Sequence, residues 1–148
     1  MNVEEIIKTE RKLPLVRRTI IHLLLVQNMI NEQMASALKP FGVSIQQFNV
    51  LRILRGQAKK PANLNTLNDR MVSKMSNTSR LVDKLILKGY VAREICETNR
   101  RKIEITITKS GKEVLSEMDA IISQKEKDLT SGFTHNELQE LNNLLDKF

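Results

Sequence analysis

The sequence of 148 residues has few aromatic side chains and a single cysteine. Phe, Tyr and Trp make up 3% of the chain and Trp is absent, so stacking on bases or sugars is not expected as the main mode of binding. One cysteine excludes an internal disulfide and fits a reducing cytosol. The longest apolar run, Thr19–Val26, is far shorter than the roughly twenty residues that a membrane span requires. Residues 1–12 carry acids and lack the apolar core of a signal peptide, which predicts a cytoplasmic protein.

The motifs of the common enzyme classes are also missing. The sequence has no glycine-rich phosphate loop, no nucleophile–histidine–acid arrangement and no suitably spaced pair of carboxylates. His22 and His135 have no second ligand at i+3 or i+4, so a metal site is not expected. These absences predict a protein that is not an enzyme and that needs no cofactor.

Positive charge is abundant, and it is concentrated in one segment. The chain carries a net charge of +7. Arg70–Lys112 holds eleven Lys and Arg against four acids, a net of +7, so the remainder is neutral. A basic face kept for solubility would not need this concentration. The segment is therefore interpreted as an electrostatic footprint for phosphate.

Helical patterns fill the first half of the chain. No helix breaker except Pro14 interrupts Leu13–Leu38, and Pro is tolerated in a first turn. The run "IIHLLLV" is apolar on almost every side, which indicates burial at a subunit interface. Ser44 and Gln47 form a capping box for the next helix. A short helix follows the linker "QAKKPAN", and its apolar stripe comprises Leu64, Leu67 and Met71.

A second short helix then presents two different faces. Its apolar arc comprises Met75, Thr78, Leu81, Val82, Leu85 and Ile86. Thr78 is therefore predicted to pack inside, whereas Arg80 lies almost opposite the middle of that arc. Asp83 is expected to have a structural role, in a pair with Arg80 or a contact to the following hairpin. Gly89 is predicted to end the helix.

The periodicity next changes from helical to that of strands. The segments "YVAREIC" and "KIEITIT" are separated by "ETNRR" and predict a hairpin with one buried face and a basic tip. Thr108 is placed to cap a long helix that reaches about Leu129. A second capping box, Thr134 and Glu137, precedes a last helix with an apolar stripe.

This order of elements predicts a mainly α fold with a small β-hairpin: a winged helix-turn-helix. A helix in the major groove needs short polar side chains and an arginine that can pair with guanine, and a wing needs arginines for the narrow minor groove. The predicted recognition-helix contacts are Ser76, Asn77, Ser79, Arg80 and Lys84. The predicted wing contacts are Asn99, Arg100, Arg101 and Lys102. The predicted contacts to the DNA backbone are Asn65, Thr66 and Lys74.

The segment "LNDRMVSKMSNTSRLVDKLILKGYVAREICETNRRKIEITITKSGKEVL" resembles the DNA-binding core of MarR-type transcriptional regulators. The family's wing pattern, Asp-x-Arg with Thr seven residues later, falls on Asn99, Arg101 and Thr108. Asn99 departs from the usual aspartate, so the usual ion pair to the wing arginine would be lost. Val72 occupies the turn where a glycine is common. The resemblance covers nearly the whole chain.

The resemblance implies a single domain over residues 1–148. Residues 41–109 would form the DNA-binding lobe, with the helix-turn-helix at about 63–88, and residues 1–40 and 110–148 would form dimerisation helices. It also implies an obligate homodimer, a palindromic operator on double-stranded DNA and, often, a small ligand that releases the DNA, with repression as the family default. The predicted dimer-interface residues are Ile20, Leu23, Leu24, Leu141, Leu145 and Phe148. His22 is a candidate for a ligand cavity between the dimer helices and the lobe.

Two alternatives remain open. Winged helices also serve as protein–protein interaction modules, although a basic wing favours DNA. Some members of the family sense oxidants through cysteine, and Cys96 lies near Arg93, Arg100 and Arg101, which could stabilise a thiolate. A lone cysteine in a strand is more often a small packing residue, and the structural interpretation is preferred.

Overall fold

The structure is a computed structural model that describes residues 1–57, 60–72, 77–95 and 103–148. It is mainly helical, with a two-stranded antiparallel hairpin, so the predicted fold class is confirmed. The elements in chain order are α1 (Val3–Ile6), α2 (Leu15–Leu38), the 3-10 helix η1 (Lys39–Phe41), α3 (Ile45–Gly56), α4 (Leu64–Arg70), α5 (Thr78–Leu87), β1 (Val91–Ile95), β2 (Ile103–Ile107), α6 (Lys109–Thr130) and α7 (His135–Leu145).

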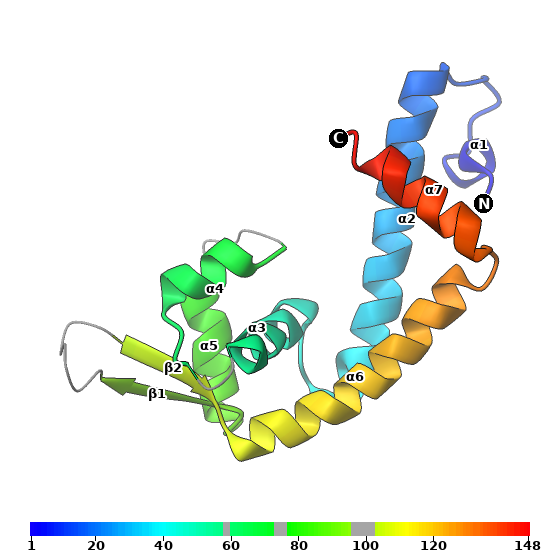
Figure 1. The fold of residues 1–148 in the computed structure, drawn as a ribbon. Coiled ribbons are helices and arrows are strands. Elements are labelled where there is room, and N and C mark those ends of the chain that lie inside the picture. Colours follow the sequence, from blue (N-terminus) through cyan, green and yellow to red (C-terminus); the bar gives the residue numbers. More distant parts are fainter. Residues whose placement is uncertain (58–59, 73–76, 96–102) are drawn as a thin grey trace.

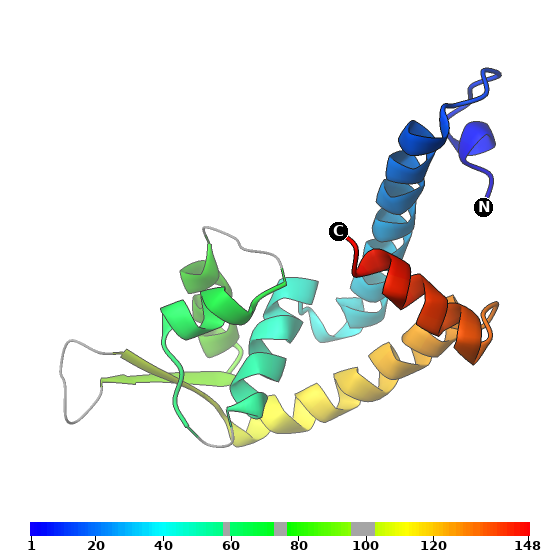
Figure 2. The ribbon, with the colours of Figure 1, turned by 45° about the horizontal axis from the view of Figure 1, so that its top comes forward.

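These elements form two regions (Figure 1). The lobe comprises α3, α4, α5 and the hairpin, and the platform comprises α1, α2, α6 and α7. The long helices α2 and α6 pack against each other. The lobe lies at one end of this pair, and α1, α7 and both chain termini lie toward the other, as the turned view in Figure 2 also shows. Helix α6 belongs to both regions, because its first half supports the lobe and its end leads into α7.

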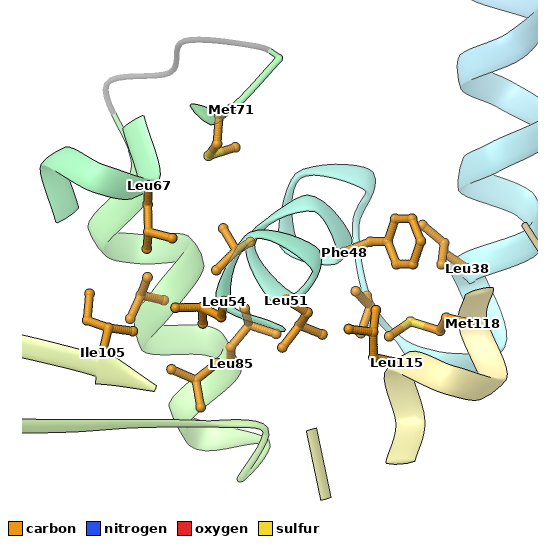
Figure 3. Close-up of a cluster of buried hydrophobic side chains, with 14 of the residues drawn as sticks. Leu38, Phe48, Leu51, Leu54, Leu67, Met71, Leu85, Ile105, Leu115 and Met118 are labelled. Carbon is orange, nitrogen blue, oxygen red and sulfur yellow. The ribbon is translucent and has the colours of Figure 1, made fainter. Parts of the chain in front are cut away.

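One hydrophobic core holds the lobe together and joins it to the platform (Figure 3). It gathers side chains from all the lobe elements, from the end of α2 and from the first half of α6. Its members include Leu38, Phe48, Leu51, Leu54, Leu67, Met71, Val82, Leu85, Ile105, Leu115 and Met118. Full burial of one such side chain stabilises the fold by about 2 kcal/mol, so this cluster fixes how α3, α5 and α6 sit together.

Local signals in the sequence set the helix ends. The predicted capping boxes are both present: Ser44 with Gln47 begins α3, and Thr134 with Glu137 begins α7. Gly89 ends α5 with a positive φ of 73°. Its N–H donates to the Ile86 carbonyl at 2.8 Å, and the Tyr90 N–H donates to the Leu85 carbonyl at 3.0 Å. This pair of bonds is a Schellman motif, and the left-handed conformation that it needs favours glycine.

The hairpin has the predicted strands, but its buried face is shorter than expected. Val91 pairs with Ile107, Arg93 with Ile105 and Ile95 with Ile103, so these side chains share one face. Val91 and Ile105 are buried, whereas Ile95 is 66% exposed. The face is therefore buried near the base of the hairpin and exposed at Ile95, and β2 packs against α3 while β1 packs against α5. Ala62 adds a bridge to Ile105 on the free edge of β2.

A close approach joins the end of α5 to the start of α6. Thr108 is the N-cap of α6, and its hydroxyl donates to the Gly89 carbonyl at 2.7 Å and accepts from the Gly111 N–H at 2.9 Å. Gly111 is buried, and a Cβ there would lie 2.1 Å from the Tyr90 carbonyl oxygen. Only glycine therefore fits at this position. The role of Gly111 was not predicted from the sequence, although a glycine in the first turn of a predicted helix was a usable signal.

Candidate nucleic-acid interface

Helix α5 presents an exposed polar face with an apolar face behind it. Thr78, Val82 and Leu85 are buried, while Ser79, Arg80 and Lys84 are exposed. The prediction that Thr78 packs inside is confirmed. The helix begins later than predicted: Asn77 is its N-cap and makes no side-chain capping bond. Asn77 therefore lies at the tip of the exposed face and not within the helix, and Ser76 lies outside the described residues.

Helix α4 holds the N-terminal end of α5 in place. The hydroxyl of the buried Thr78 donates to the side-chain oxygen of Asn68 on α4. Met71 and Leu67 are buried in the core below this contact. A hydrogen bond between a buried hydroxyl and an amide oxygen fixes the rotamers of both side chains. Ser79 and Arg80 come directly after Thr78 in the chain, so this contact also holds them at a fixed place on the helix.

The residues predicted to contact the DNA backbone are placed at the start of α4. Asn65 is exposed and Thr66 is half-buried. Asn63 is the N-cap of this helix, and its side-chain oxygen accepts from the Thr66 N–H at 2.8 Å and from the Thr66 hydroxyl at 3.1 Å. The hydroxyl proton of Thr66 is therefore engaged within the helix cap, which leaves the oxygen as an acceptor. Lys74 lies outside the described residues.

An ion pair joins α5 to the wing. Arg93 Nη2 on β1 lies 2.9 Å from Asp83 Oδ1 on α5. Of the two roles considered for Asp83, the contact with the wing is confirmed. The pair neutralises a carboxylate that would otherwise repel phosphate beside Lys84. It also engages the one described arginine that was considered as a partner for Cys96. Cys96, Asn99, Arg100, Arg101 and Lys102 lie outside the described residues.

A cleft separates α2 from the start of α3. It has a volume of about 1150 Å³. Its lining residues come from α2, from the turn around Gly42, from the first turns of α3 and from Val72. His22 was a candidate for a cavity between these regions, but it is half-buried nearer the start of α2 and is not among the lining residues. On α2 the lining of this cleft begins at Gln27, more than a helical turn further along, so the role of His22 stays a prediction.

The platform leaves a wide apolar surface uncovered. Leu24 is 53% exposed and Phe148 is 85% exposed, and α7 buries none of its residues. The other residues predicted for a dimer interface are Ile20, Leu141 and Leu145, which are exposed, and Leu23, which is half-buried. Exposed apolar area of this extent on one region is unusual in a monomer.

The part of the chain that the structure describes offers neither a metal site nor a membrane-spanning helix. No group of three or more His, Cys, Asp or Glu side chains there could hold a metal ion. None of the helices there is long and apolar enough to cross a membrane.

The lobe and the whole fold are both similar to known proteins. Residues 43–103 match the MarR family, and this segment contains α3, α4, α5, β1 and the start of β2. The lobe of this chain is therefore similar to the MarR family. A MarR-like transcription regulator from Bacillus cereus has 24% identity over 88% of this chain and 93% of its own, with a TM-score of 0.79.

Two further structures extend the MarR comparison beyond the lobe. MarR from E. coli in its apo form has 24% identity over 93% of this chain and 98% of its own, with a TM-score of 0.70. CouR from Rhodococcus jostii, solved with p-coumaroyl-CoA, has 22% identity over 90% of this chain and 93% of its own, with a TM-score of 0.76. At these identities the likeness shows the fold. The chain thus has the fold of MarR-family transcription regulators, platform helices included.

Proposed function

We propose that this chain is a sequence-specific DNA-binding transcription regulator that acts as a homodimer in the cytoplasm. Helix α5 enters the major groove and reads base edges through Asn77, Ser79 and Arg80, with Lys84 near phosphate. Ser76 is proposed to join them. The family default makes it a repressor. MarR-family regulators are generally not enzymes, and no catalytic step is proposed here.

The observation that carries this proposal is the supported, exposed polar end of α5. Arg80 is exposed, while its neighbour Thr78 is buried and bonded to Asn68. An arginine on a helix with a fixed position and rotation can offer two parallel N–H groups to guanine O6 and N7. The concentration of positive charge between Arg70 and Lys112 supplies the attraction to phosphate that brings this helix to the groove.

The remaining predicted contacts follow from the position of the wing beside α5. We propose that Arg100 and Arg101, with Asn99 and Lys102, approach the minor groove next to the major groove that α5 occupies. Asn65, Thr66 and Lys74 would contact the backbone at the start of the helix-turn-helix. These contacts depend on charge and groove width and position the lobe, whereas α5 specifies the sequence.

The uncovered apolar surface of the platform supports the homodimer. Ile20, Leu23, Leu24, Leu141, Leu145 and Phe148 would become buried between the two copies, and the two lobes would then present two α5 helices to one face of DNA. A twofold dimer requires a palindromic site with half-sites about one helical turn apart.

We also propose that a small molecule regulates the protein from the cleft between α2 and α3. The cleft lies between α2 of the platform and α3 of the lobe, and CouR, which shares this fold, was solved with p-coumaroyl-CoA. Neither alternative gains support: no observation favours a protein–protein module, and Arg93, which could activate Cys96, is paired with Asp83.

The test is selection of bound duplexes from a random pool with the purified protein. The proposal predicts enrichment of one palindromic motif, here called the operator, and a footprint that covers both halves. It would be overturned if the bound fraction carried no common sequence after repeated rounds.

A further inference from the structure

The outer half of the hairpin carries two apolar side chains that the lobe does not cover. The hairpin extends outward past α5 (Figure 1). On this outer part Ile95 of β1 lies directly opposite Ile103 of β2. Ile95 is 66% exposed and Ile103 is 43% exposed, whereas Val91 and Ile105 on the same face are buried. Ile95 and Ile103 are called the isoleucine pair below.

The isoleucine pair lies on the side of the wing that faces α5. A cross-strand pair of branched side chains stabilises a hairpin whether or not anything binds to it, so the pair by itself is not informative. Its face is identified by Arg93, which shares that face and whose Nη2 lies 2.9 Å from Asp83 Oδ1 on α5. Ile95 follows on the same face, two residues further out along β1.

The opposite face of the outer hairpin has the contrary character. Glu94 lies directly opposite Glu104 on that face. Among the residues that the structure describes, no ion pair engages either carboxylate. Two like charges opposite each other destabilise a hairpin, and both carboxylates repel phosphate. A wing that approaches a duplex therefore turns this face away and presents the isoleucine pair.

We propose that the isoleucine pair packs against deoxyribose rings of the DNA strand that passes between α5 and the wing. The proposal rests on the proposed function, which places α5 in the major groove and the wing beside the adjacent minor groove. The sugar rings are the apolar part of that strand, and apolar side chains are used at minor grooves by other DNA-binding proteins. Contacts with sugars carry no sequence information, so the isoleucine pair strengthens binding to any duplex.

Ile95→Thr tests this contact. Threonine keeps the branched shape that favours a strand, while a hydroxyl replaces apolar surface. We expect the affinity for operator and for scrambled duplex to fall by the same factor, about tenfold, because each dimer loses two apolar contacts. The slope of log affinity against log salt should stay the same, because no phosphate contact is lost. Ile103→Thr should reproduce both results, and Ile95→Val, which stays apolar, should bind like the parent.

Glu94→Thr is the matched control, because it introduces the same residue at the neighbouring position on the opposite face. This variant should bind both duplexes at least as tightly as the parent. Hydroxyl-radical cleavage locates the contact, since the radical attacks exposed deoxyribose. The parent should protect the sugars between α5 and the wing in each half-site. Ile95→Thr should lose that protection and keep the protection beside α5, and urea denaturation should show that it remains folded.

Three results would overturn the inference. The first is Ile95→Thr binding like the parent, and the second is an equal loss of affinity in Glu94→Thr. The third is a loss of affinity with a shallower salt slope, because the wing would then have moved its basic residues away from phosphate. Failure of the proposed function would look different, since the parent protein would then select no operator.

Discussion

The lobe and the platform differ in how completely each buries its own apolar side chains. In the lobe, residues from α3, α4, α5 and the hairpin close around one core. In the platform, α2 buries only Ala37 and Leu38, both at the end that meets the lobe, and α7 buries none. The lobe therefore buries its apolar side chains within one chain, whereas the apolar side chains of α2 and α7 in the platform lack a covering surface. A second copy with the same apolar faces would provide it.

This difference in burial also implies that the lobe and the platform are stabilised in different ways. The lobe depends on packing within the chain, so its fold should not vary with protein concentration. In the proposed homodimer the platform is covered by the second copy, so its stability should rise with concentration by mass action. Helix α6 is shared by both, and a defect at its start should disturb the whole molecule.

Gly111→Ala tests that shared joint. The added Cβ would lie 2.1 Å from the Tyr90 carbonyl oxygen, which is backbone and cannot turn away. We expect the free energy of unfolding to fall by about 3 kcal/mol or more, measured by urea denaturation. Gly56→Ala is the matched control, because a Cβ there meets nothing within 4 Å and alanine favours the helix. Equal stability of the two variants would show that α6 does not pass the chain at Tyr90 as closely as described.

Leu24→Arg should disturb the platform and leave the lobe unchanged. A charge in the buried face of a dimer costs about 2 kcal/mol, or a roughly thirtyfold weaker dimer. Sedimentation should shift from twice the 17.0 kDa chain mass toward that mass, while the helical signal of the lobe remains. Gln33→Arg adds the same charge on the other side of α2 and should stay dimeric. A parent protein that sediments as a folded monomer would contradict the comparison itself.

Arg93→Gln changes the lobe alone. The pair with Asp83 is partly exposed, so its loss should lower stability by only about 0.5 kcal/mol. Operator affinity should fall further than this, because the freed Asp83 carboxylate then faces phosphate. Lys109→Gln is the control for the loss of one positive charge: its contact with Glu113 is 3.9 Å long and well exposed, so its loss should leave stability unchanged and lower operator affinity less than Arg93→Gln does. If both variants behaved alike in urea denaturation and operator binding, the wing would not depend on this ion pair.

Most of the fold could be predicted from the sequence because its signals are local. Capping boxes at Ser44 and Thr134, the glycine after α5 and the alternation in the hairpin each act within a few residues. The buried side of α5 followed from helical periodicity alone, and Thr78 was placed correctly by that criterion. The order of these elements predicted the winged helix-turn-helix, and the resemblance to MarR-type regulators agreed with it.

Features that depend on residues distant in the chain could not be predicted. The contact between Gly111 and Tyr90, the place of Val72 in the cleft and the exclusion of His22 from it require the packing of α6 and α2 against the lobe. Asp83 illustrates the limit: its structural role was expected, but the choice between Arg80 and the wing needed the position of β1. The length of the buried hairpin face was overestimated for the same reason.

The central claim is that α5 reads sequence. It is tested most directly by measuring the affinity of Arg80→Ala and of the parent for operator and for scrambled duplex at several salt concentrations. The loss of a base contact should cost about 1–3 kcal/mol on the operator and relax the preference at one symmetric pair of positions. Scrambled duplex should be affected little. Arg101→Ala in the wing is the control, with weaker binding on both duplexes and a shallower salt dependence. If Arg80→Ala weakened both duplexes equally, α5 would not read sequence through Arg80, which would contradict the proposed function.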